Sequence, residues 1–109
     1  MGYMVNGVEL EADEEGYLLA PDYSEDAARA IAQAEGIELG EDHWKVIAYL
    51  REQYREHGHT PNFRAMLKDM AERIPGCDSK ALYDLFPGGP AKQGARVAAL
   101  PKPYGKGGY

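Results

Sequence analysis

The chain has 109 residues, 44% of them hydrophobic, and a formal net charge of −6. This length predicts one domain with a modest apolar core, and no apolar run approaches the roughly 20 residues that a transmembrane helix needs. A single cysteine excludes an internal disulfide and leaves the redox compartment open, with the cytosol as the default.

The charge is divided unevenly along the chain. Residues 1–86 contain all 18 acidic residues and eight of the 12 basic ones, a net charge of −10, whereas residues 87–109 contain four basic residues and no acidic one, a net charge of +4. The acidic body argues against nucleic acid as a partner. The basic end predicts contact with an acidic surface, either on a partner protein or on the body of this chain, or a simply solvated tail.

Residues 3–19 predict a β-hairpin followed by a short extended return. Asn6-Gly7 stands between apolar flanks and supplies the two positive-φ residues of a type I′ turn. We expect the apolar side chains of these strands to face the core: Met4, Val8 and Leu10.

Residues 22–99 predict about five helices, because apolar residues repeat there with helical spacing between capping residues and Gly or Pro breaks. The expected segments run to about residues 35, 57, 74, 86 and 99. The expected capping residues are Asp22 or Ser24 for the first helix, Thr60 for the third, and Asp78 or Ser79 for the fourth.

The second of these helices is expected to be the central core element. Trp44, Ile47 and Leu50 fall on its apolar stripe, and Arg51 is assigned to its solvent side. Beyond about Ala99, two prolines and several glycines predict a flexible arm over residues 100–109. We therefore expect one domain over residues 1–99, a mostly α (α+β) small orthogonal helical bundle with an N-terminal β-hairpin, and then the arm.

Cys77 is the only nucleophilic sulfur. Its place close to a helix N-terminus favours a lowered thiol pKa, whereas the neighbouring Asp78 opposes it, so both a structural role and a working thiol stay open. The chain has no zinc spacing, phosphate loop or Ser-centred elbow, so we expect no metal site and no cofactor. Taken alone, these residues do not indicate an enzyme.

Helices three and four have the proportions of a helix-turn-helix, joined at residues 75–77. Lys80 is the single base on the second of them, which also carries Asp84. Reading DNA normally requires more positive charge, so plain helix packing is the preferred interpretation, and a DNA-binding regulator is kept as an alternative.

Several runs together resemble the DsrC/TusE sulfur-relay family, which includes the gamma subunit of dissimilatory sulfite reductase. The similarity covers nearly the whole chain and is densest over residues 89–105. The runs that carry it are Asp13-Glu14-Glu15-Gly16-Tyr17-Leu18, His43-Trp44, Leu50-Arg51, Leu82-Tyr83-x-Leu85-Phe86-Pro87, Gly-Pro-Ala-Lys-Gln at residues 89–93, and Leu-Pro-Lys-Pro-x-Gly at residues 100–105.

The resemblance implies a cytoplasmic helical bundle with an N-terminal hairpin and a mobile arm that passes sulfur between proteins. In the family, one arm cysteine follows the Gly-Pro-Ala-Lys-Gln run and a second follows the Leu-Pro-Lys-Pro-x-Gly run. The matching positions here are Ala95 and Lys106, and three further residues follow. Neither side chain can hold sulfane sulfur, because a thiolate is needed for sulfur exchange.

Our preferred hypothesis is therefore a non-catalytic binding or regulatory member of this family. Its partner would be a protein with an acidic surface, either a sulfite reductase or a sulfur-relay protein, and no membrane would be involved. The residues expected to bind that partner are Lys92, Arg96, Lys102, Tyr104 and Lys106. The alternative is a sulfur carrier, in transfer-RNA thiolation or dissimilatory sulfur metabolism, that uses Cys77.

Overall fold

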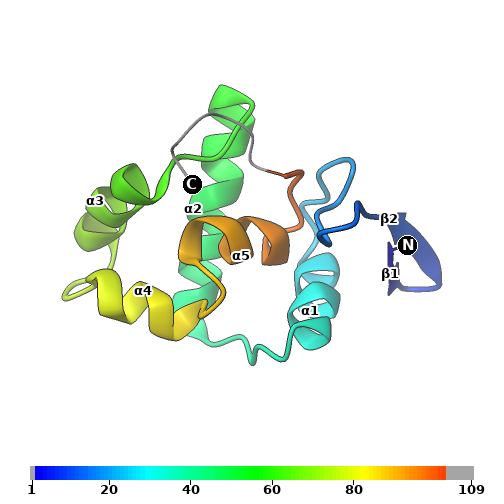
Figure 1. The fold of residues 1–109 in the computed structure, drawn as a ribbon, viewed down its shortest axis with the longest axis horizontal. Helices are drawn as coiled ribbons and strands as arrows, with labels where there is room; N and C mark the ends of the chain where they lie inside the picture. The colour runs from blue at the N-terminus through cyan, green and yellow to red at the C-terminus, as the bar shows by residue number, and fades with distance from the viewer. Residues whose placement is uncertain (1, 103–109) are drawn as a thin grey trace.

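The computed structural model describes residues 2–102, so the predictions for Tyr104 and Lys106 lie outside the described residues. The elements are β1 Gly2–Val5, β2 Val8–Glu11, α1 Glu25–Ala34, α2 Glu41–His57, α3 Phe63–Arg73, α4 Ser79–Leu85 and α5 Pro90–Val97 (Figure 1). The predicted fold class, a helical bundle with an N-terminal hairpin, is confirmed. Within the described part, no helix has both the length and the apolar character that a membrane crossing requires.

The other four helices are arranged around α5. We had expected α2 to be the central helix, and that expectation is wrong. Figure 1 shows α5 near the middle of the molecule, and it contacts each of the other four helices. Small residues permit this close packing: a Cβ added at Gly94 would lie 3.1 Å from Leu50 Cδ1 on α2. The short helix that leads into the C-terminal segment is thus the centre of the core.

The hairpin has the predicted turn but a different inward face. Asn6 and Gly7 have φ values of 52° and 81°, as a type I′ turn requires. The register pairs Tyr3 with Leu10 and Met4 with Glu9, so Met4 shares the outward face with a glutamate. Met4 is accordingly 64% exposed, and Val8, at the tip, is also exposed, while Tyr3 and Leu10 pack against the core. The expectation was right for Leu10 and wrong for Met4 and Val8.

Local capping signals explain where most helices begin. The side chains of Ser24 and Asp78 accept hydrogen bonds from the third amide of α1 and α4, as predicted. The prediction for α3 is wrong, because Asn62 Oδ1 caps the helix through Ala65 N at 2.9 Å, and Thr60 is buried two residues earlier. Asn is a better cap than Thr, and it moves the helix start beyond Pro61.

The packed body extends past the predicted boundary at Ala99. Leu100 is fully buried in the core cluster, and its amide donates to Ala95 O at 3.2 Å. The turn that follows α5 folds Leu100 back into the bundle, where burying its side chain contributes about 1.5–3 kcal/mol. Leu100 therefore belongs to the domain and not to an arm.

Candidate functional site at the base of the C-terminal segment

The described residues predicted to bind a partner lie on α5 and just after it. Lys92 is exposed on the first turn of α5, Arg96 is half-buried on the last turn, and Lys102 is exposed beyond the helix. Ala95, which the sequence resemblance predicted to stand at the position of an arm cysteine, is fully buried between them. A side chain at this position faces the core, so a larger side chain would have to displace its packed neighbours.

Arg96 and Lys102 are already paired within the chain. Both oxygens of Glu35, at the end of α1, accept hydrogen bonds from the Arg96 guanidinium, one of them from Nη2 at 2.8 Å. This hydrogen bonding raises the pKa of Arg96. Lys102 Nζ donates to the carboxylate of Glu15 in the loop before α1, and this contact raises the pKa of Lys102.

Gln93 extends the Glu35 contacts to the turn before α5. Its Nε2 donates to Glu35 Oε1 at 2.8 Å, and its Oε1 accepts from Gly88 N at 2.7 Å. Glu35 therefore fixes both ends of α5 at once, since Arg96 holds the last turn and Gln93 holds the turn that precedes the first. Because these groups are largely buried, their hydrogen bonds are worth more than exposed ones.

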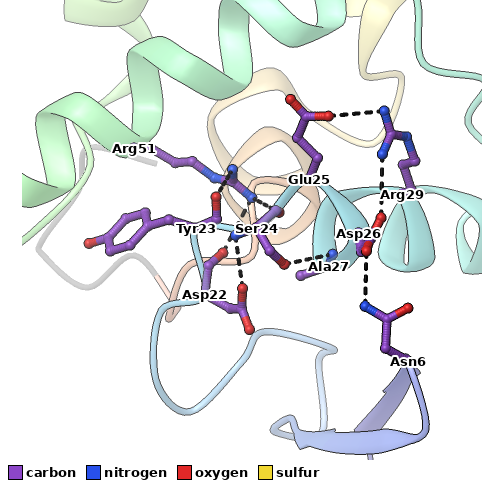
Figure 2. Close-up of polar contacts among 9 residues, drawn as sticks. All are labelled: Asn6, Asp22, Tyr23, Ser24, Glu25, Asp26, Ala27, Arg29 and Arg51. Atoms are coloured by element: carbon purple, nitrogen blue, oxygen red, sulfur yellow. Dashed lines mark hydrogen bonds and ion pairs between the residues drawn. The ribbon is translucent and has the colours of Figure 1, made fainter.

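Arg51 of α2 joins the end of α5 to the start of α1. Its side chain is buried, with the residue only 8% exposed, and its guanidinium points at the loop before α1 (Figure 2). Nε donates to Ala98 O at 2.9 Å, and Nη1 donates to Tyr23 O at 2.7 Å. Nη2 donates to Ser24 O at 2.8 Å and to Asp22 O at 3.3 Å.

A backbone hydrogen bond completes this junction. Asp22 N donates to Ala99 O at 3.0 Å, next to the carbonyl that Arg51 holds. Ala99 has φ of 64°, a left-handed conformation that costs a non-glycine residue about 1–2 kcal/mol. The chain thus leaves α5 through a turn that is strained but held by Arg51 and Asp22. We call these contacts the Arg51 junction.

The assignment of Arg51 to the solvent side of its helix is wrong. Fixed donors in a planar fork allow one guanidinium to donate to four backbone carbonyls at once. A signal was present, because Arg51 lies four residues after Ile47 and so on the apolar stripe. The Glu35 contacts gave no comparable signal, since Glu35 and Arg96 are far apart in the sequence.

Cys77 lies in the turn between α3 and α4, away from the Arg51 junction. It is a free thiol with 7% exposure, at a surface hollow of about 290 Å³ that Asp42 and Asp84 also line. Burial, and then the carboxylates of Asp78 and Asp42, raise the pKa of the Cys77 thiol. At neutral pH the group is therefore held as the weakly nucleophilic thiol.

The positive charge on which a DNA-reading α4 would depend is offset by a carboxylate on the same helix. Lys80 Nζ pairs with Asp84 at 3.1 Å on the same short helix. His43 also fixes this helix: Gly40 N donates to its Nδ1 at 3.0 Å, so Nε2 carries the proton and donates to Leu85 O at 2.9 Å. The α3–α4 turn is therefore well explained as helix packing.

Trp44 is half-buried, although its spacing predicted a core position. It lines two surface grooves, one beside Tyr23 and Arg55 and one beside Ile37 and Leu39. The Arg29 guanidinium lies 5.2 Å from the centre of its ring. Trp44 thus forms a ridge between two grooves on α1 and α2.

Comparison with known proteins identifies the family. The family model described as "DsrC like protein" matches residues 4–106. The sulfurtransferase TusE homolog of Haemophilus influenzae is 50% identical over 103 residues, covering 91% of this chain and 94% of the relative. Sulfurtransferase TusE of Escherichia coli is 44% identical over 100 residues, covering 89% of this chain and 92% of the relative.

Solved structures agree with this assignment. The oxidized gamma subunit of dissimilatory sulfite reductase (DsrC) from Archaeoglobus fulgidus matches with a TM-score of 0.87 at 38% identity, covering 96% of this chain and 98% of that one. DsrC of Allochromatium vinosum matches with a TM-score of 0.84 at 42% identity, covering 93% of each chain. The match over residues 4–106, the identities of these relatives and the likeness of the solved structures show that this chain belongs to the DsrC/TusE family.

Proposed function

We propose that this protein works in a sulfur relay, through protein partners that engage the segment after α5. The observation that carries the proposal is the family match over residues 4–106, which includes that segment. Relatives at 44–50% identity are named sulfurtransferases. A chain of dissimilatory sulfite reductase I also matches, at 35% identity with a TM-score of 0.78, which supports a protein partner. The acidic character of the partner and a cytoplasmic location remain predictions.

The names of the relatives favour the sulfur-carrier alternative over the non-catalytic role that we preferred from the sequence. In this chain sulfur carriage can involve only Cys77, its single cysteine. The Cys77 thiolate would attack the outer sulfur of a donor persulfide, forming a new S–S bond as the donor leaves as a thiolate. Because Cys77 is buried and its pKa is raised, this step requires the turn at residues 75–77 to open.

A second candidate is a relay protein that binds the same partners without carrying sulfur. The observation that favours it is the pair of positions that match the family's arm cysteines. Ala95 is buried and has no heteroatom, and the other position is Lys106, which lies outside the described residues. In this case the segment would serve for recognition alone.

Mass spectrometry separates the two candidates. The protein is incubated with a persulfide-charged cysteine desulfurase, alone and as the Cys77→Ser variant. A carrier gains roughly 32 Da, the mass of one sulfur atom, in the wild type but not in the variant. No gain in either protein supports the cargo-free role.

Partner capture tests the relay proposal itself. The full-length protein and a form ending at Lys102, which keeps the buried Leu100, are compared as baits in an extract of the native host. Capture of sulfur-relay proteins or sulfite reductase by the full-length bait alone is the expected result. If neither bait captures such a protein and no sulfur adduct forms, the proposed function is wrong.

A further inference from the structure

A second surface at the other end of α5 has the features of a peptide-binding groove. The groove has a volume of about 320 Å³ and lies where α3 and α5 begin, beside α4. Its lining is Phe63, Tyr83, Pro87, Gly88, Gly89, Pro90, Ala91 and Lys92. We call it the Tyr83 groove.

An aromatic pair forms one wall of the Tyr83 groove. The rings of Phe63 and Tyr83 lie 5.5 Å apart at an angle of 58°, and Tyr83 is 47% exposed. Large apolar side chains exposed beside a hollow are common at sites of protein recognition. The wall offers apolar ring surface to an incoming aromatic or leucine side chain.

The floor of the groove is held in place by the side chain of Gln93. Gly88 N is bonded to Gln93 Oε1, and a Cβ at Gly88 would lie 3.0 Å from the Gln93 side chain. Gly89 has φ of 111°, which favours glycine. A floor of proline and tightly held glycine loses little conformational freedom when a ligand binds.

The Tyr83 groove differs in charge from the acidic body around it. Lys92 is the single charged residue that lines it, and no carboxylate does. Over residues 2–102, Arg96 and Lys102 are engaged by Glu35 and Glu15, whereas no ion pair involves Lys92. Of the three described basic residues predicted to bind a partner, Lys92 is thus the one whose charge is not used within the body.

We propose that the Tyr83 groove binds an acidic peptide segment of a protein partner. An aromatic or leucine side chain of that segment packs on Phe63 and Tyr83, and an adjacent carboxylate pairs with Lys92. The inference rests on the proposed relay function, since it names a face of the body that a relay partner would use. It adds a contact site that is separate from the segment after α5.

A titration by amide NMR tests the groove with a defined probe. The probe is the blocked peptide acetyl-Glu-Leu-Phe-Glu-amide, and its counterpart has lysine in place of each glutamate. The acidic peptide is expected to shift the amides of Tyr83, Gly88 and Lys92. The lysine peptide is expected to leave them in place.

Matched variants identify the residues responsible. Lys92→Glu is expected to weaken binding of the acidic peptide by about two- to fivefold, the range of one surface ion pair, while Lys92→Arg retains it. Tyr83→Ala should weaken the apolar packing of the peptide and, with it, the ion pair to Lys92. Lys45→Glu, on α2 and outside the groove, is the control and should bind as the wild type does.

The outcome is decisive in either direction. Equal shifts with both peptides, shifts confined to other elements, no shifts, or unchanged binding by Lys92→Glu would each overturn the inference. Those results leave the proposed relay function standing if the full-length bait still captures its partner. Conversely, groove binding without a sulfur adduct or a captured relay partner would overturn only the proposed function.

Discussion

The two ends of α5 are held in different ways. Its C-terminal end is fixed by the Arg51 junction and by the Glu35–Arg96 pair, so buried polar groups tie it to α1 and α2. Its N-terminal end follows a Pro-Gly-Gly-Pro turn, and there Gln93 supplies one side-chain bond and the surface opens into the Tyr83 groove. The C-terminal end is held by contacts within the chain, whereas the N-terminal end leaves the Phe63–Tyr83 pair and Lys92 accessible at the groove.

This difference indicates a division of labour along one short helix. A segment that must present itself reproducibly to partners needs a fixed origin, and buried charge-assisted hydrogen bonds provide one. A recognition surface needs accessible groups instead, and the N-terminal end of α5 offers them at the Tyr83 groove. The comparison can be tested by removing contacts at each end and measuring the free energy of unfolding.

Replacing Arg51 is expected to have the largest effect. Arg51→Met removes the donors from four backbone carbonyls while keeping much of the side-chain volume. We expect a loss of about 3–5 kcal/mol in the free energy of unfolding, measured by urea denaturation. Arg51→Lys should recover only part of it, because an ammonium cannot reproduce the fork.

The control for Arg51 is the neighbouring Arg55, which stacks on Tyr23 at 4.1 Å without holding the junction. Arg55→Met should cost about 1 kcal/mol or less, the range of a partly exposed cation–π contact. Equal losses for the two variants would contradict the special role of the Arg51 junction.

Breaking the Glu35–Arg96 pair should have the second largest effect. Arg96→Met leaves Glu35 with Gln93 as its remaining side-chain donor. Because the side chains of Arg96 and Glu35 are 21% and 14% exposed, we expect a loss of about 1–3 kcal/mol. Lys80→Met, at the exposed pair with Asp84 on α4, should leave the denaturation midpoint almost unchanged. A similar drop in both variants would remove the contrast between buried and exposed pairs.

Relieving the strain at Ala99 should give a small gain. Ala99→Gly removes the cost of a left-handed alanine but adds freedom to the unfolded chain. We expect a net stabilisation of about 0.5–1 kcal/mol by urea denaturation. Destabilisation would indicate that the Ala99 methyl group, which is buried, contributes more through packing than its backbone loses through strain.

Acid should loosen the junction slightly through Asp22. The hydrogen bonds from Ser24 lower the pKa of Asp22, which accepts from Ser24 N at 2.9 Å. A lowered carboxyl pKa contributes stability that is present above the unfolded value, about 3.9, and is lost as the pH falls through the folded value. Denaturation midpoints between about pH 5 and pH 2 should therefore fall less steeply for Asp22→Asn than for the wild type. Parallel curves would show that Asp22 does not contribute.

Local features of this fold could be predicted from the sequence, and tertiary ones could not. The Asn6-Gly7 turn, the Ser24 and Asp78 caps and the five helices depend on neighbouring residues, so short patterns reveal them. The buried role of Arg51 depends on carbonyls from two other parts of the chain, residues 22–24 and Ala98. The same holds for the position of Leu100, which was predicted to lie in an arm because of the prolines and glycines that follow it.

The candidate site was predictable only in part. The family resemblance predicted a site in the segment after α5 and at the positions Ala95 and Lys106, because those runs are long and specific, and that assignment stays a prediction. Which basic residues are available to a partner could not be predicted, since Arg96 and Lys102 meet Glu35 and Glu15 only after the chain has folded. The Tyr83 groove likewise combines residues from α3, α4 and α5.

The Arg51 junction has a mechanical consequence. A partner that pulls on the chain beyond Lys102 applies its load first to the Glu15 contact and then to the carbonyls of Ala98 and Ala99. The hydrogen bonds from Arg51 and from Asp22 N pass that load to α2 and to the loop before α1. The load therefore does not fall on α5 alone. Tension on the segment would thus be shared among several hydrogen bonds, and the folded body would anchor the segment.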